Sequence, residues 1–500
     1  RLLIDTKNLS LADSLNLSDV MKIVDELNYR YYHNDNPKKL NFKNQDRKFL
    51  TALLDRMFQG DRCDICTCYE KKQLWNGFLH HIHYQPKNEE AEIFVHAMRT
   101  KGNESVYSEF EKLMQENRYQ QAAELLREKK GTSALLRNMD YIISRMDREA
   151  EQTFLSEFPE DCSTLILLQL LFRYEGVQRK DGRIFKFTQH NLMKVHYETP
   201  EESKKCQSRL TEEQVKEIGK MIRSKLSEKL GNRLGKVYIE PSMKNYTLPL
   251  AENTSQGGLG VLSKGSRIPI DEGKKLRAFT YWEKVNDIDL SVFALTEDGN
   301  RREFSWRTMS RHQSGAITYS GDETSGYLGG SEYFDINLPE FKAQYSEYRY
   351  LIFCDNVYSG KNFNKCFCKA GYMLRDWDDS GQVYEPKTVK SAYLVNCEST
   401  FAYLFGIDLF TNEFVWLNVA KNSKSRVAGD TNLSFLTDYF HLTDVMNMYD
   451  FFSMMAEKIV EDPMEADVVV TDHEVKCTEE AQIIREYDFE KIRMLMEDAK

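Results

Sequence analysis

The spacing of apolar residues changes along the chain, and this change limits the folds that the sequence can adopt. Up to about residue 170, apolar residues recur three or four positions apart, which is the period of an amphipathic helix. From about Gly257 to Ala420 they alternate with polar residues between frequent turns, which is the pattern of a β-sandwich. The flanking segments mix both patterns. We therefore predict a multidomain α+β protein.

The chain is too long for one hydrophobic core, since it has 500 residues, and several domains are expected. We place the boundaries where the period changes. The predicted parts are a helical N-terminal scaffold domain over 1–170, an α/β connector over 171–254, an antiparallel β-sandwich over 255–421 and a small acidic helix–strand–helix segment over 422–500.

Charge and hydropathy exclude several classes of protein. The longest apolar stretch, Leu165–Phe172, is far shorter than the roughly 20 residues of a membrane helix, so we predict no membrane span. The net charge is −10, and residues 456–500 carry fourteen acidic and six basic side chains, which is −8 of that total. The remaining residues are close to neutral and show no basic patch typical of DNA binding.

The ten cysteines form no framework of short regular spacings. This distribution is typical of reduced thiols and predicts a cytoplasmic protein. The sequence starts at Arg1 rather than Met and shows no signal-peptide pattern, as expected of an N-terminally truncated fragment.

The run VNDIDLSVFALTEDGN places two aspartates on one face of a predicted strand. Side chains alternate across a strand, so Asp287 and Asp289 share a face, about 7 Å apart. Ile288 and Leu290 then point to the core. The two carboxylates repel each other, and a hard divalent cation would reverse that repulsion. A solvated polar face with a turn at EDGN explains the same pattern without a cation.

A loop rich in glycine and acidic residues follows, in ITYSGDETSGYLGGSEYFDINL. Its glycines allow positive φ angles, which can turn carbonyl oxygens inward beside Asp322, Glu323 and Glu332. Carboxylate and carbonyl oxygens together suit Ca²⁺, whereas zinc prefers His and Cys. The spacing does not fit an EF-hand, and a long hairpin connection would also need glycines without any ion. The residues alone leave both interpretations open.

An ordered set of motifs resembles the TerD proteins of tellurium resistance and stress response. The segments are VLSKGSRIPID, RAFTYWEKVNDIDLSVFAL, AITYSGDETSGYLGGSEYFDINL, YSGKNFNKCFCKAGYMLRD and STFAYLFGIDLFTNEFVWLNVA. The resemblance implies a TerD-like β-sandwich that binds calcium. By position, the implied ligands are Asp287, Asp289, Asp322 and Glu332, with Glu323 where the family usually has asparagine. The N-terminal helical region also resembles that of large TerD-bearing proteins.

The sequence departs from the TerD pattern at LGGSE, where the family often has a longer, Asp-rich run. Calcium affinity falls as the charge of the ligands falls. The resemblance therefore implies that one of two cation sites is weakened or lost in this chain.

The run CDICTCYEKKQLWNGFLHHIHY offers an alternative metal site. Cys63 and Cys66, together with His80 and His83, could bind Zn²⁺. The histidines are closer together than in usual zinc motifs, and KKQLWNGFL has the pattern of an ordinary amphipathic helix. A cysteine-rich loop before a helix explains the run without a metal.

The common catalytic motifs are absent from the sequence: it has no Walker loop, no dinucleotide-binding glycine fingerprint, no Gly-x-Ser-x-Gly and no His-Glu-x-x-His. We predict a non-enzymatic, calcium-binding stress-response adaptor, in which the cation organises a surface for protein partners. The alternative is a metal-independent scaffold whose helical N-terminal domain binds a protein or RNA. A third hypothesis is an enzyme that uses Asp472 and His473, at the end of the strand ADVVVTD.

Overall fold

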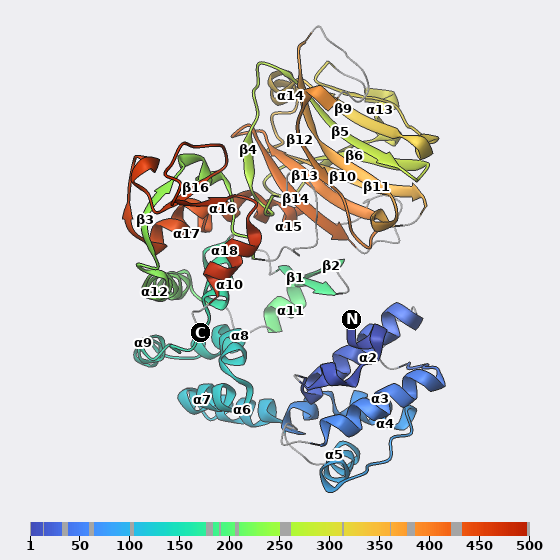
Figure 1. Ribbon diagram of the computed structural model, residues 1–500, viewed down its shortest axis with the longest axis vertical. Coiled ribbons are helices and arrows are strands. Elements are labelled where there is room, and N and C mark those ends of the chain that lie inside the picture. Colours follow the sequence, from blue (N-terminus) through green and yellow to red (C-terminus); the bar gives the residue numbers. More distant parts are fainter. Residues whose placement is uncertain are drawn as a thin grey trace. The chain divides into compact units, whose positions relative to one another are not determined.

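The structure is a computed structural model. It describes residues 2–13, 15–32, 39–59, 65–100, 105–176, 184–189, 192–205, 210–250, 262–312, 315–360, 362–377, 386–421 and 433–497. The chain divides into two compact units, Arg1–Cys162 with Gln207–Leu210, and Ser163–Cys206 with Thr211–Lys500 (Figure 1). The first unit is helical, and the second combines helices with sheets. The predicted multidomain α+β fold is confirmed.

The first unit consists of helices that begin where the sequence supplies a cap. The side chains of Asn88, Ser105 and Asp147 accept hydrogen bonds from N–H groups in the first turns of α5, α6 and α9. The helices are α1 (Leu2–Thr6), α2 (Leu17–Tyr32), α3 (Asn44–Met57), α4 (Lys72–His81), α5 (Glu89–Arg99), α6 (Val106–Gln115), α7 (Tyr119–Lys130), α8 (Thr132–Ile143) and α9 (Arg148–Ser156), with the 3-10 helices η1 (Leu9–Ala12) and η2 (Ile65–Lys71).

Aromatic side chains form the centre of this helical core. Trp75 of α4 is buried and packs edge-on against Phe94 of α5, with ring centroids 5.0 Å apart. Phe58, which follows α3, packs against the same Phe94 ring at 5.2 Å. These contacts join three consecutive helices, because large rings bury much apolar area at each contact.

The second unit begins with a helix that the sequence analysis divides between two domains. Helix α10 (Thr164–Glu175) packs against α12 (Glu212–Leu230), and Arg223 of α12 forms an ion pair with Glu175. The predicted boundary at residue 170 therefore falls inside a helix of the second unit. Among the described residues, the structure contains no helix with the length and apolarity needed to cross a bilayer.

Two sheets form the sandwich of the second unit. Neighbouring strands pair antiparallel throughout both, apart from one parallel bridge between β2 and β14. One sheet has the order β1-β2-β14-β13-β10-β6-β7, with β4 beside β14, and the other has the order β12-β11-β5-β9-β8. The strands are β1 (Ile184–Gln189), β2 (Leu192–Tyr197), β4 (Arg267–Pro269), β5 (Lys275–Glu283), β6 (Asp287–Leu295), β7 (Arg301–Phe304), β8 (Ile317–Tyr319), β9 (Gly330–Ile336), β10 (Tyr350–Ser359), β11 (Phe367–Arg375), β12 (Val389–Leu394), β13 (Phe401–Asp408) and β14 (Glu413–Lys421), with the helices α11 (Pro200–Lys205), α13 (Trp306–His312) and α14 (Leu338–Gln344).

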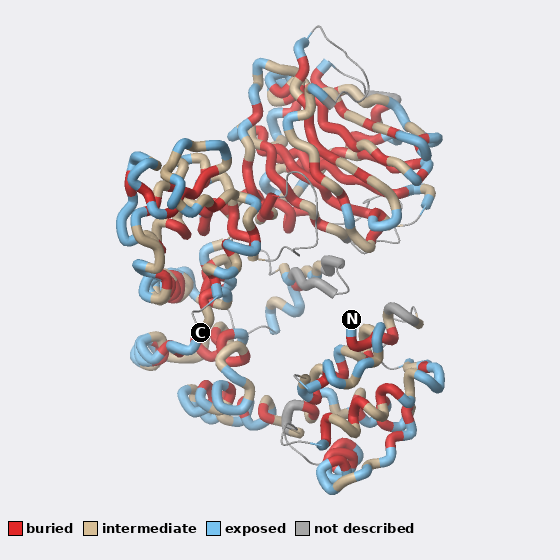
Figure 2. Tube along the Cα trace, in the orientation of Figure 1, coloured by how far each residue is buried: buried red, intermediate tan, exposed pale blue. Residues whose placement is uncertain are grey.

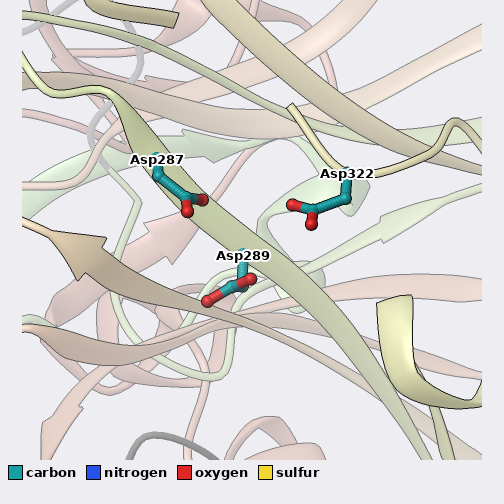
Figure 3. A group of neighbouring side chains, drawn as sticks. All are labelled: Asp287, Asp289 and Asp322. Atoms are coloured by element: carbon teal, nitrogen blue, oxygen red, sulfur yellow. The ribbon is translucent and has the colours of Figure 1, made fainter. Parts of the chain in front are cut away.

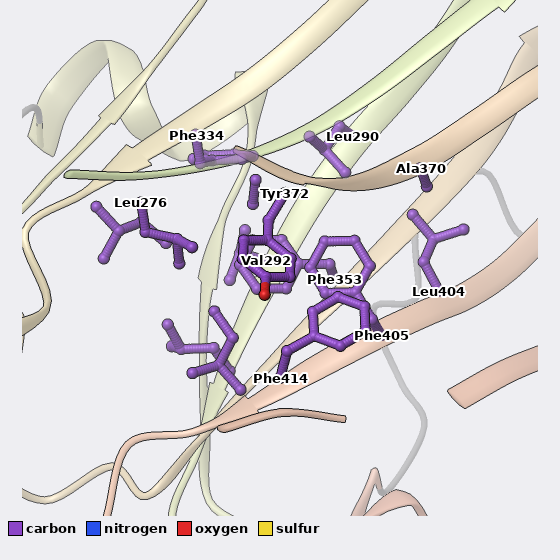
Figure 4. Close-up of a cluster of buried hydrophobic side chains, with 14 of the residues drawn as sticks. Leu276, Leu290, Val292, Phe334, Phe353, Ala370, Tyr372, Leu404, Phe405 and Phe414 are labelled. Atoms are coloured by element: carbon purple, nitrogen blue, oxygen red, sulfur yellow. The ribbon is translucent and has the colours of Figure 1, made fainter. Parts of the chain in front are cut away.

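The sandwich core lies between the two sheets, and both contribute alternate residues to it. Figure 4 shows part of this cluster, in which Leu290 and Val292 of β6 lie near Phe353 of β10. Phe353 and Phe405 stack with ring centroids 4.6 Å apart. Figure 2 shows that buried residues follow the strands of the sandwich over most of their length. The two-residue period of the sequence thus corresponds to inward-facing side chains.

The outer face of the larger sheet is also apolar, and a short segment after the sandwich covers it. Phe293 and Tyr403 on this face belong to one buried cluster with Phe435 and Phe440. The covering elements are α15 (Ser434–Thr437), η7 (Asp438–His441) and α16 (Leu442–Val445). Both faces of this sheet are therefore buried, which explains why β13 is apolar without alternation.

A small parallel sheet joins the predicted connector to the predicted C-terminal segment. Its order is β15-β3-β16-β17, where β3 (Leu234–Ile239) precedes the sandwich and β15 (Ala456–Ile459), β16 (Val468–Thr471) and β17 (Gln482–Arg485) follow it. Strand β3 pairs in parallel with β15 on one side and with β16 on the other. Helices α17 (Met448–Met455) and α18 (Phe489–Met496) complete this part. Strands β4 to β14 are thus inserted between β3 and β15, whereas β1 and β2 precede β3 and join the larger sheet from outside this insertion. Strands β15 and β17 add to the predicted helix–strand–helix pattern.

A chain that ends at Met455 tests this shared sheet. It keeps the sandwich and its cover but removes both strands that pair with β3, and with them the interstrand hydrogen bonds of β3. We expect the backbone amides of β3 to lose protection from hydrogen exchange, whereas those of β10 keep theirs. Unchanged protection in β3 would contradict the shared sheet.

Candidate metal centre

Three aspartates converge at one end of the sandwich. Asp287 and Asp289 are on β6, and Asp322 is in the loop after β8. One carboxylate oxygen from each lies within 4.8 Å of the other two. Figure 3 shows the Asp322 carboxylate directed from its separate loop toward the two on the strand. We call these three residues the aspartate triad.

The alternation of β6 brings the first two members of the triad to one face. Ile288 and Leu290 point into the sandwich core, so Asp287 and Asp289 lie on the opposite face. Both are nonetheless buried, at 6% and 7% exposure, whereas Asp322 is exposed. Asp289 accepts a hydrogen bond of 3.2 Å from the side-chain amide of Asn356, which lies opposite it on β10.

The third member of the triad is positioned by Glu332, a fully buried residue of β9. One Glu332 oxygen accepts a hydrogen bond from the Leu290 N–H at 2.8 Å, and the other accepts one from the Glu323 N–H at 3.1 Å. Burial raises the pKa of Glu332 to about 8, although these hydrogen bonds favour its charged form. Its two oxygens therefore hold the loop that carries Asp322 against the edge of β6.

Of the five predicted calcium ligands, the structure brings together Asp287, Asp289 and Asp322. Glu323 instead accepts a hydrogen bond of 2.7 Å from the Ser325 N–H within its own loop. Glu332 accepts hydrogen bonds from the backbone N–H groups of Leu290 and Glu323. Sequence patterns cannot distinguish these roles, because they depend on how β6, β9 and the loop after β8 meet in the fold.

The like-charged carboxylates of the triad lie close together at a poorly hydrated site. Burial raises the pKa of Asp287 to about 6, and the neighbouring Asp289, Asp322 and Glu323 add to this effect. Burial likewise raises the pKa of Asp289 to about 6, although its bond from Asn356 opposes the shift. The Oδ1 atom of Asp287 is buried and has no hydrogen-bond partner in the described part of the chain. A buried oxygen without a partner is costly, and a cation would satisfy it.

The donor set of the triad fits a hard cation. Three carboxylates supply between three and six oxygens, and Ca²⁺ takes 6–8 oxygen ligands, with waters and carbonyls completing the shell. Zinc would need nitrogen or sulfur donors for a typical site. The residues that would hold Ca²⁺ are Asp287, Asp289 and Asp322.

Sequence reasoning missed two polar residues in the middle of β10. Asn356 binds Asp289, and Asp355 lies fully buried between the sheets, where it accepts a hydrogen bond of 2.7 Å from the Thr280 hydroxyl. Burial raises the pKa of Asp355 to about 7. The signal was available in the sequence, because Asp-Asn interrupts the otherwise apolar strand LIFCDNVYS.

The glycines of the loop serve two different purposes. Gly321 and Gly329 have φ angles of 95° and 144°, which side chains disfavour, as the sequence analysis expects of loop glycines. Gly326 and Gly330 instead pack on the indole of Trp282, where a Cβ atom would lie 2.5 and 2.4 Å from the ring. The loop therefore needs glycine for close packing as well as for backbone freedom.

The predicted zinc ligands fall largely outside the described residues. Cys63 lies outside them, and so does the side chain of Cys66. The rings of His80 and His83 are 6.3 Å apart between centroids. His81, which lies between them, is partly buried and accepts a hydrogen bond from the Phe42 N–H at 3.3 Å. The zinc hypothesis stays a prediction.

Asp472 and His473 follow β16 and form a polar cluster at the carboxyl end of the parallel sheet. The Asp472 carboxylate accepts a hydrogen bond from the Tyr246 hydroxyl at 3.0 Å and lies 2.8 Å from Nδ1 of His473. Glu240 lies 3.7 Å from the other nitrogen of this histidine. Asp472 and His473 thus lie in a cluster with Tyr246 and Glu240, and the enzyme hypothesis stays a prediction.

Comparison of the chain with models of known protein families, with curated proteins and with solved structures finds no match. The resemblance to TerD proteins thus depends on the ordered motifs alone and stays a prediction. The geometry of the triad is independent of that resemblance.

The raised pKa values predict how stability depends on pH without divalent cations. The folded pKa of Asp287, about 6, exceeds its value in an unfolded chain, about 4, so the folded state binds the proton more tightly. The protein should therefore lose stability as pH rises from about 4 to about 6. Over this pH range, the free energy of unfolding of Asp287→Asn should decrease by about 1–3 kcal/mol less than that of the wild type.

Chemical denaturation in chelator at a series of pH values measures this effect. The exposed Asp298, in the turn after β6, provides the matched control Asp298→Asn. Equal pH dependence in the wild type and Asp287→Asn would contradict the proposed crowding.

Proposed function

We propose that this protein is a non-enzymatic calcium-binding protein, in which the aspartate triad binds the cation and thereby fixes a loop surface for recognition. The observation that carries the proposal is the buried Oδ1 of Asp287, which has no partner among the described residues, in a carboxylate that lies close to those of Asp289 and Asp322. Such an arrangement is unfavourable for the protein alone and becomes favourable with a divalent cation.

The site is largely organised before the cation binds, which supports selective binding. Asp287 and Asp289 are fixed by the pairing of β6 with β10. The loop with Asp322 is fixed by the Glu332 carboxylate and by a hydrogen bond of 2.8 Å from the Gly326 N–H to the Asn286 carbonyl. Binding then needs little ordering of the backbone, and the cation adds a link between the strand and the loop.

Calcium is the cation that the site favours. Magnesium demands a near-ideal octahedron and keeps most of its water, whereas calcium accepts irregular shells of carboxylates and waters. With three carboxylates, one of them exposed, we infer a dissociation constant on the order of 10⁻⁴ M.

The wider role follows from the resemblance to TerD proteins, which predicts a cytoplasmic stress-response adaptor with protein partners. The competing function is a metal-independent scaffold that binds a protein or RNA through the helical N-terminal unit. The two functions differ in one property, since only the first depends on a bound cation.

Calcium titration of the full chain tests the proposal. We expect binding heat for the wild type and its loss in Asp287→Asn and in Asp289→Asn, because each removes a charged ligand. At calcium about 100-fold above the dissociation constant, binding should stabilise the folded protein by about 2.7 kcal/mol. The control Asp298→Asn should bind like the wild type. Absence of both heat and thermal stabilisation at millimolar calcium would exclude the calcium function and favour the scaffold.

A further inference from the structure

A short turn beside the triad displays apolar side chains to solvent. This turn, η4 (Gly326–Leu328), lies between the loop that carries Asp322 and strand β9. Leu328 is 92% exposed and Tyr327 is 55% exposed. Tyr358 on β10, also 53% exposed, precedes Ser359, which is opposite Asp287 in the sheet. Apolar side chains gathered at one end of a domain commonly mark an interaction site.

The exposed turn is held rigidly rather than left loose. The Lys284 N–H donates a hydrogen bond to the Tyr327 carbonyl at 2.9 Å, and the Gly326 N–H donates one to the Asn286 carbonyl at 2.8 Å. Lys284 itself has φ of 67°, which is uncommon for a residue other than glycine. The close packing of Gly326 and Gly330 on the Trp282 indole also holds the turn in place. These contacts therefore hold Leu328 in its solvent-exposed position.

The turn and the triad are joined through the same connection. Lys284–Asn286, which holds the turn, leads directly into Asp287 at the start of β6. Asp322 precedes the turn within its own loop. A cation in the triad would therefore lie beside the base of the turn.

The charge of this end of the sandwich depends on the cation. Without calcium, the aspartate triad repels any anionic surface. With calcium bound, most of that negative charge is neutralised, and the exposed Lys284 adds a positive charge next to the turn. Calcium with open coordination positions can also accept phosphate or carboxylate oxygens from lipid headgroups.

We propose that this turn is a calcium-dependent docking site for an anionic lipid bilayer, with Leu328 and Tyr327 inserted at the boundary between headgroups and acyl chains. This inference rests on the proposed function, because it needs calcium in the triad. A bilayer suits the site since the apolar side chains project from the domain, and tyrosine and leucine are typical of interfacial insertion. The anionic headgroups then meet the calcium and Lys284.

Sedimentation of the full chain with vesicles tests the proposal. The vesicles contain phosphatidylcholine with about a third phosphatidylserine, in about 1 mM calcium or in chelator. We expect the wild type to sediment only when both calcium and phosphatidylserine are present. Leu328→Asp should weaken vesicle binding roughly tenfold or more, since it replaces an inserted apolar side chain with a charge.

Phe410 provides the matched control. It is 81% exposed and lies in the turn between β13 and β14, at the opposite end of the sheet from Asp287, because Asp408 pairs with Tyr350, which pairs with Leu295. Phe410→Asp should sediment like the wild type. Both variants should keep the calcium binding heat of the wild type, which also shows that they are folded.

The outcomes separate the two proposals. If calcium gives no heat, both the calcium function and the bilayer site are excluded. If calcium binds but the chain stays in the supernatant, only the bilayer site is excluded. The exposed turn would then bind a pocket on a protein partner. Equal sedimentation of Leu328→Asp and the wild type, or equal loss in Phe410→Asp, would also overturn the bilayer site.

Discussion

The carboxylate of Glu332 joins the two sheets of the sandwich at the edge where the triad forms. Strand β7 pairs with β6 only from Val292 onward, so the earlier part of that edge lacks a neighbouring strand. Glu332 supplies an acceptor for the Leu290 N–H there and holds the loop through the Glu323 N–H. A buried carboxyl group is tolerated because its hydrogen bonds replace those with water. The triad and the glycine turn both depend on this arrangement.

The rigid frame explains why the aspartates remain crowded. Side chains on a flexible loop would separate to relieve the repulsion among Asp287, Asp289 and Asp322. Here the strand pairing of β6 fixes two of them, and the Glu332 bonds restrain the loop of the third. The packing of the sandwich thus keeps the three carboxylates close together despite their repulsion. A bound cation would offset that repulsion.

The sandwich is also tied to the rest of the second unit by buried charge. Arg267 on β4 forms ion pairs with Asp408 and Glu413 and donates a hydrogen bond to the Phe440 carbonyl of the covering segment. A guanidinium has several donors in a fixed geometry, so this one side chain can join β13, β14 and the cover. This contact links the sandwich to its cover, and the parallel sheet around β3 joins the chain segments before and after strands β4 to β14.

The sequence alone determined the fold class and indicated the carboxylates of the candidate site. Its two periods predicted the helical and sandwich regions, and the alternation around Asp287 and Asp289 predicted a shared face, because these patterns follow from local backbone geometry. Only the tertiary structure decided that Asp322 joins this pair while Glu332 supports the loop instead. It also decided that β3 lies between strands from the far end of the chain. Pairing and convergence between distant segments depend on packing in three dimensions, for which local periodicity carries no signal.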